Sequence, residues 1–121
     1  MELKRVVVTG LGALTPVGNT VAETWENLVN GVSGAGPITH FDASKFKTHF
    51  ACEVKNFNGT DYIDRKELRK MDLYTQYAIA AAKEAVEDSG MDLEKEDLNR
   101  IGVIYGVGIG CLLYTSPSPR D

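Results

Sequence analysis

The chain has 121 residues, of which 43% are hydrophobic and 25% charged, and its formal net charge is −4 at pH 7. This length predicts one domain or part of one, with the composition of a globular protein. The acidic balance argues against a nucleic-acid partner, and no apolar run is long enough to span a membrane. Because the apolar run at residues 6–8 is too short for a signal peptide, we expect a cytoplasmic protein.

The first predicted element is a buried strand at residues 5–9, a β-branched run that ends at Gly10. Glycines and a proline then predict a loop over residues 10–20. Thr20 and Glu23 have the spacing of a capping box, and apolar side chains follow on one helical face until Gly31. The pattern therefore predicts a helix of about three turns.

Residues 32–63 are predicted to be irregular, with scattered aromatic side chains that pin the segment to a core and a possible edge strand at residues 51–54. A basic, helix-prone segment follows at residues 64–71. Asp72 is a candidate N-cap of an alanine-rich helix that ends at Gly90, and we expect this helix to lie deep inside. Residues 101–105 predict a second buried strand. The order of elements indicates an α/β fold with parallel strands joined by a right-handed crossover.

The glycines after the first predicted strand resemble part of a dinucleotide-binding fingerprint. The full pattern needs a third small residue where this chain has Thr15, and the helix begins too late to meet a pyrophosphate. We therefore interpret Gly10 and Gly12 as a structural turn. A dinucleotide-binding domain stays open as an alternative that titration with NAD would test. The later glycines at 106, 108 and 110 lack the Lys and Ser/Thr of a phosphate loop.

The cysteines and histidines do not form a recognisable site. Cys52 and Cys111 are too few for a disulfide framework, and neither has zinc-ligand spacing with His40 or His49. Cys111 precedes a Ser/Pro-rich stretch that would not hold a helix, so it lacks the setting of a nucleophile. Cys52 is most simply a small buried residue. We predict no catalytic residue, metal or cofactor here.

The strongest charge cluster consists of Arg65, Lys66, Arg69 and Lys70. Spacings of four residues place two basic rows on one helix face. Such a face is either simply solvated or a dock for an acidic partner, because local positive charge steers anionic ligands. The residues alone leave both interpretations open.

Four stretches together carry a family resemblance. They resemble the N-terminal part of the β-ketoacyl-[acyl-carrier-protein] synthase II family, the elongating condensing enzymes of bacterial fatty acid synthesis, over residues 4–110: KRVVVTGLGALTPVGNTVAETWENLVNGVSG, ITHFDASKFKTHFACEVKNFN, DRKELRKMDLYTQYAIAAAKEAVEDSG and RIGVIYGVGIG. The resemblance implies the incomplete N-terminal part of a thiolase-like layered α-β-α-β-α fold and a homodimeric parent. It also implies an acyltransferase that condenses acyl thioesters with malonyl-[acyl-carrier protein] by a decarboxylative Claisen reaction.

The resemblance carries over to a few residues. Lys66, Arg69 and Lys70 match the family's basic patch for acyl- and malonyl-loaded acyl carrier protein, with Arg65 beside them, which favours the docking interpretation. Ile109 matches an apolar position that lines the acyl pocket. The family's nucleophilic cysteine and two histidines would lie beyond residue 110, so we predict that this chain is inactive.

The last eleven residues, CLLYTSPSPRD at 111–121, depart from the family pattern. Codons that encode them resemble a transposase adapter used for short-read sequencing libraries. We therefore expect a partial synthase domain at residues 1–110 and a non-native tail at 111–121. We also expect poor solubility, because a half-built sheet leaves its edges uncovered. The alternative is a stand-alone carrier-protein-docking module without catalysis, which requires a closed fold within 110 residues.

Overall fold

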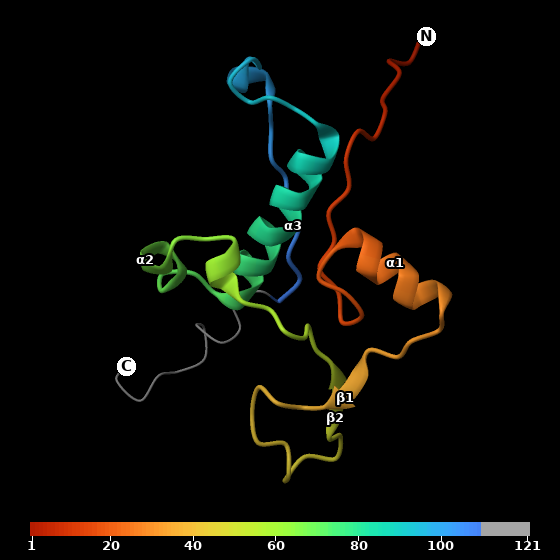
Figure 1. The fold of residues 1–121 in the computed structure, drawn as a ribbon, viewed down its shortest axis with the longest axis vertical. Coiled ribbons are helices and arrows are strands. Elements are labelled where there is room, and N and C mark those ends of the chain that lie inside the picture. Colours follow the sequence, from red (N-terminus) through yellow and green to blue (C-terminus); the bar gives the residue numbers. More distant parts are fainter. Residues whose placement is uncertain (110–121) are drawn as a thin grey trace.

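The computed structural model describes residues 1–109, so the tail predicted at 111–121 lies outside the described residues. The elements in chain order are α1 (Val21–Val29), β1 (Ala35–Pro37), β2 (Phe50–Cys52), the 3-10 turn η1 (Gly59–Asp61), α2 (Arg65–Leu68), α3 (Leu73–Ser89) and the 3-10 turn η2 (Leu98–Arg100). Strands β1 and β2 pair antiparallel, with Gly36 opposite Ala51. Figure 1 shows α3 at the centre, with α1 and α2 on opposite sides of it.

Helix α1 begins with the predicted cap. The Glu23 amide donates to Thr20 Oγ1 at 3.1 Å, as a capping box requires. The Glu23 carboxylate also reaches back, as predicted, and accepts from the Asn19 amide at 3.3 Å. The helix ends at Val29, just before Gly31, so both ends of this helix follow local sequence signals.

Helix α3 has the predicted bounds but not the predicted depth. Asp72 occupies the N-cap position without a side-chain cap bond, and Gly90 ends the helix with φ +69°. That left-handed conformation is one that glycine adopts without steric cost. Ala80, at 4% exposure, is the one buried residue of α3. The prediction that α3 lies deep inside is therefore wrong for the described residues.

The two predicted parallel strands are also wrong for the described part of the chain. Residues 5–9 and 101–105 belong to no strand, and Val6 and Ile104 are 88% and 99% exposed. The sheet within residues 1–109 is the short β1–β2 pair, and β1 lies where a loop was predicted. A strand forms when a second strand satisfies its N–H and C=O groups, and neither run has such a partner among these residues.

The hydrophobic core is thin. Between residues 1 and 109 only Ala43 and Ala80 are buried hydrophobic residues, while Trp25 on the apolar face of α1 is 67% exposed. Cys52, expected to be buried, is exposed at the end of β2. No helix in this part of the chain has both the length and the apolar character needed to cross a membrane.

Two of the predicted aromatic plugs, Phe57 and Tyr62, are half-buried and stacked on each other. The ring of Phe57 lies 5.7 Å from that of Tyr62 and 5.0 Å from that of Tyr77, so it fixes the segment before α2 against α3. Phe41 and Phe46 contact each other at 5.6 Å, but both remain exposed and pin nothing to a core.

Candidate functional site

The glycine turn packs directly on α3. A Cβ placed on Gly12 would overlap the carbonyl oxygen of Ala81, and a Cβ on Gly10 would overlap that of Ala85. The missing side chains therefore allow two backbones to approach closely. This confirms the structural interpretation of the turn.

Carboxylates of α3 occupy the amides of the same turn. Leu11 N donates to Asp88 Oδ2 at 2.9 Å, and Ala13 N donates to Glu84 Oε1 at 2.9 Å. Glu84 also accepts from Val21 N, at 3.0 Å through Oε2, and so ties the start of α1 to α3. A bound pyrophosphate would compete with these carboxylates for amides and be repelled by them. The geometry therefore disfavours a dinucleotide site here.

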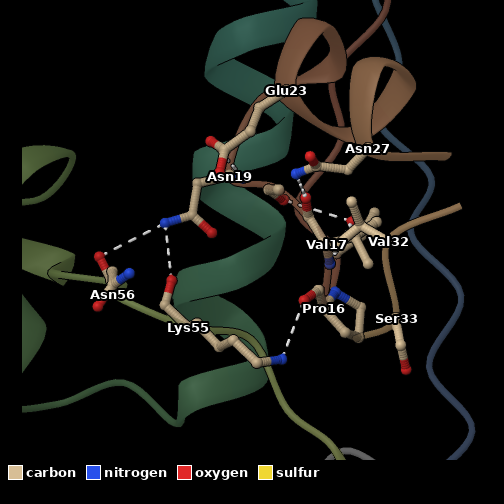
Figure 2. A pocket seen from close by; sticks show the side chains of 11 residues that line it. Pro16, Val17, Asn19, Glu23, Asn27, Val32, Ser33, Lys55 and Asn56 are labelled. Atoms are coloured by element: carbon tan, nitrogen blue, oxygen red, sulfur yellow. Dashed lines mark hydrogen bonds between the residues drawn. The ribbon is translucent and has the colours of Figure 1, made fainter. Parts of the chain in front are cut away.

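A polar hollow of about 360 Å³ lies between the loop before α1 and the segment around Lys55 (Figure 2). Lys55 Nζ donates to the carbonyl oxygens of Pro16 at 3.0 Å, Gly34 at 2.7 Å and Glu53 at 2.9 Å. These three bonds use all the donors of an ammonium group. Lys55 therefore joins three segments of chain and has no donor left for a ligand.

The asparagines of this hollow serve the same structural purpose. Asn19 Nδ2 donates to the Lys55 carbonyl at 3.0 Å, and Asn27 Nδ2 donates to the Val17 carbonyl (Figure 2). Both side chains hold loop backbone whose carbonyls have no partner in a helix or strand. We interpret the hollow as a joint between segments.

The structure brings the four predicted basic residues together on one exposed turn, which we call the basic turn (residues 65–70). Arg65 and Lys66 belong to α2, Arg69 is its C-cap in helical conformation, and Lys70 follows. Lys70 Nζ lies 3.7 Å from Glu67 Oε1. Within residues 1–109 the other three side chains form no ion pair, so their charges face solvent.

Contacts on both flanks fix the basic turn to α3. After it, Gln76 Nε2 donates to the Met71 carbonyl at 3.3 Å. Before it, Lys83 Nζ donates to the Tyr62 carbonyl. Leu68 is half-buried, and η1 contacts both α2 and α3. Contacts with α3 therefore hold the basic turn in place, although α2 itself spans only four residues.

The remaining predicted positions are scattered. Ile109 is 75% exposed, and its role in an acyl pocket stays a prediction. His40 Nε2 lies 3.3 Å from Glu53 Oε2, and Glu53 also accepts from Thr39 Oγ1 at 2.9 Å. These contacts join the chain at residues 39–40 to Glu53, and we call them the loop clasp. Residues 1–109 contain no cluster of three or more side chains able to hold a metal ion.

Burial raises the pKa of the Glu53 carboxyl, but hydrogen bonds outweigh this effect. Donation from the Thr39 hydroxyl and amide, and from the His40 amide, holds that pKa below its ordinary value. The clasp therefore favours the ionised carboxylate.

Sequence reasoning missed Glu84 and Lys55 as organising residues. A signal existed for Glu84, because it is an acidic residue on the helix face shared by Tyr77, Ala80 and Ala81. A carboxylate on such a face needs donors nearby. No local pattern distinguishes Lys55, since two of its three acceptors, the Pro16 and Gly34 carbonyls, lie in distant segments.

The comparisons identify the family. The family model described as Beta-ketoacyl synthase, N-terminal domain, matches residues 3–120. The chain therefore belongs to the β-ketoacyl synthase family. The match runs through residues 111–120, and the non-native origin of the tail stays a prediction.

Curated relatives narrow the resemblance. The chain is 54% identical over 107 residues to 3-oxoacyl-[acyl-carrier-protein] synthase 2 of Staphylococcus aureus (strain COL), covering 88% of this chain and 26% of the relative. It is 52% identical over 112 residues to the protein of the same name from Vibrio harveyi, covering 93% and 27%. The chain thus spans about a quarter of the length of these relatives.

Two solved structures of ketosynthases are also similar to this chain. The ishigamide ketosynthase/chain length factor matches with a TM-score of 0.68 and 41% identity, over 73% of this chain and 22% of that one. A type II PKS acyl-carrier protein in complex with its ketosynthase, bound to the hexaketide, gives a TM-score of 0.63 and 31% identity, over 81% and 24%. These likenesses confirm the predicted α/β, thiolase-like class, although strands at residues 5–9 and 101–105 are absent from the described structure.

Proposed function

We propose that the chain is the N-terminal part of an elongating β-ketoacyl-[acyl-carrier-protein] synthase, an acyltransferase of fatty acid elongation. The names and identities of the two curated relatives support this proposal. In this reaction a protein cysteine takes the acyl group as a thioester. The malonyl unit then loses carbon dioxide, and its carbanion attacks the thioester carbonyl and releases the thiolate. We propose a cytoplasmic, homodimeric parent.

Within residues 1–109, Cys52 and His40 are not placed as this chemistry would require. Cys52 ends strand β2 and does not lie at a helix N-terminus, where a thiolate would be stabilised. His40 pairs with Glu53 in a loop clasp. We therefore propose that this chain alone does not catalyse condensation. Detection of a β-ketoacyl product by mass spectrometry, after incubation with acyl- and malonyl-loaded carrier protein, would refute that statement.

We further propose that the basic turn docks an acidic acyl carrier protein. The single observation that carries this proposal is that Arg65, Lys66 and Arg69 are exposed without a carboxylate partner in the described structure. Unpaired cations on an acidic chain create a local field that steers an anionic partner. A solved relative whose title names an acyl-carrier protein in complex with its ketosynthase supports the choice of partner.

Charge reversal tests the docking proposal. We expect the K66E/R69E variant to bind fluorescently labelled holo-acyl carrier protein at least about tenfold more weakly than the unchanged chain at low salt. The matched control is K4E/R5E, which makes the same charge change in the exposed N-terminal run. Equal binding by K66E/R69E and K4E/R5E would contradict the proposal.

A further inference from the structure

One of the four cations of the basic turn differs from the others. Lys70 Nζ lies 3.7 Å from Glu67 Oε1 across a spacing of three residues, and both side chains are largely exposed. Arg65, Lys66 and Arg69 have no such partner within residues 1–109. The turn therefore presents three free cations and one that is partly neutralised by a neighbour.

The Glu67 carboxylate makes no other ion pair or hydrogen bond in the described structure. Glu67 contributes to the fold of the turn through its backbone. Its carbonyl accepts a hydrogen bond from Lys70 N at 3.0 Å. The N-cap position of α2 belongs to Asp64, and Leu68 N bonds the Asp64 carbonyl at 2.9 Å. Replacing the Glu67 carboxylate by an amide should leave the turn intact.

A carboxylate in the middle of a cationic surface opposes an acidic partner in two ways. It holds Lys70, so an incoming carboxylate must displace it, and it repels the incoming negative charge directly. An exposed ion pair of this kind changes affinity by about twofold to fivefold. That effect is small enough to preserve binding and large enough to accelerate release.

We propose that Glu67 is an attenuating residue of the docking surface, which weakens its hold on an acidic carrier protein by competing for Lys70. This inference rests on the proposed docking function. Attenuation suits a partner that must leave after each transfer, because a shared carrier has to dissociate before a newly loaded one can bind.

The test compares two variants of the complete 121-residue chain that each remove one negative charge. E67Q breaks the pair in the basic turn. D92N breaks the Lys95–Asp92 pair, which has the same spacing of three residues and an Nζ–Oδ2 distance of 3.8 Å. Asp92 follows α3, and the basic turn precedes it; a helix of 17 residues separates them by about 25 Å. At physiological salt this distance exceeds the Debye length several-fold.

We expect E67Q to bind holo-acyl carrier protein about twofold to fivefold more tightly, mainly through slower dissociation, and D92N to bind like the unchanged chain. Removing the cation should also matter more once Glu67 is gone. K70Q should therefore lose more affinity in the E67Q background than alone. Equal tightening by E67Q and D92N, or no tightening by E67Q, would overturn the inference.

The outcomes also separate this inference from the docking function. If K66E/R69E weakens binding but E67Q does not tighten it, the basic turn docks the carrier and Glu67 does not attenuate it. If K66E/R69E has no effect, the docking function fails and the inference fails with it. Circular dichroism is the structural control, and a loss of helical signal in E67Q would overturn the premise that the Glu67 carboxylate is not needed for the fold.

Discussion

Two regions of this chain are built in opposite ways. The glycine turn, α1 and α3 are joined by a close backbone approach and by the Glu84 carboxylate, which accepts from two amides in separate segments. The runs at residues 5–9 and 101–105 are more apolar in sequence, yet they form no strand and are exposed. The apolar character of a segment therefore did not decide whether it packs against the rest of the chain.

The difference shows which interactions a segment can satisfy by itself. A helix makes its own backbone hydrogen bonds and needs only caps and one supporting face. A strand depends on another strand for every backbone bond, and its partner is often distant in sequence. The chain spans about a quarter of the length of its curated relatives.

The largest expected effect on stability comes from placing a side chain where the Gly12 backbone approaches α3. Gly12→Val should destabilise the fold by about 3 kcal/mol, because the new side chain would overlap the Ala81 carbonyl. The measurement is the urea midpoint by circular dichroism. Gly102→Val is the matched control, since an added Cβ there meets nothing within 4 Å. Similar midpoints for both variants would show that the glycine turn is not tightly packed.

The second-largest effect on stability should come from removing the Glu84 carboxylate, which accepts from the Ala13 and Val21 amides. Glu84→Ala should cost about 2 kcal/mol in unfolding free energy, because it leaves the Ala13 and Val21 amides partly buried without an acceptor. Glu87→Ala removes an exposed carboxylate one turn along the same helix and should be nearly neutral. If the two variants unfold at the same urea concentration, the Glu84 carboxylate does not stabilise this region.

The cap of α1 should have a smaller effect. Thr20→Ala should cost about 1 kcal/mol, because the Glu23 amide loses its side-chain acceptor. Thr20→Ser keeps a hydroxyl and should retain most of that stability, as judged by thermal unfolding. Equal losses in the two variants would show that the hydroxyl is not the stabilising group.

The loop clasp should give the smallest effect, visible as a pH dependence. The folded pKa of Glu53 is depressed below its ordinary value of 4.5. Its stabilising contribution is therefore fully present above that value and is lost as pH falls through the lower folded pKa. Glu53→Gln should flatten the acid side of the stability curve. An acid limb unchanged by the substitution would contradict this assignment.

Local signals predicted the helical part of the fold well. The Thr20 cap and the Gly90 stop lie where the sequence placed them, because each depends on residues within one turn. The predicted strands at residues 5–9 and 101–105 failed for the opposite reason, since pairing is non-local. Strand β1 was missed because Pro37 and two glycines suggested a loop, while the pairing with β2 lies outside any local window.

The candidate site was predicted in composition but not in detail. Spacing alone placed the four cations on one face, and the structure keeps them exposed on the basic turn. Which of them is paired depends on side-chain geometry, so the Lys70–Glu67 contact could not be read from the sequence. The three carbonyls around Lys55 were equally inaccessible, because they converge only in three dimensions.

The central claim is that this chain docks a carrier protein through the basic turn and carries no catalytic centre within its described residues. Hydrogen exchange measured by mass spectrometry, with and without holo-acyl carrier protein, tests it most directly. We predict slower exchange at residues 65–70 on binding and unchanged fast exchange at residues 5–9 and 101–109. Unchanged exchange at 65–70, with new protection in the two exposed runs, would contradict the account.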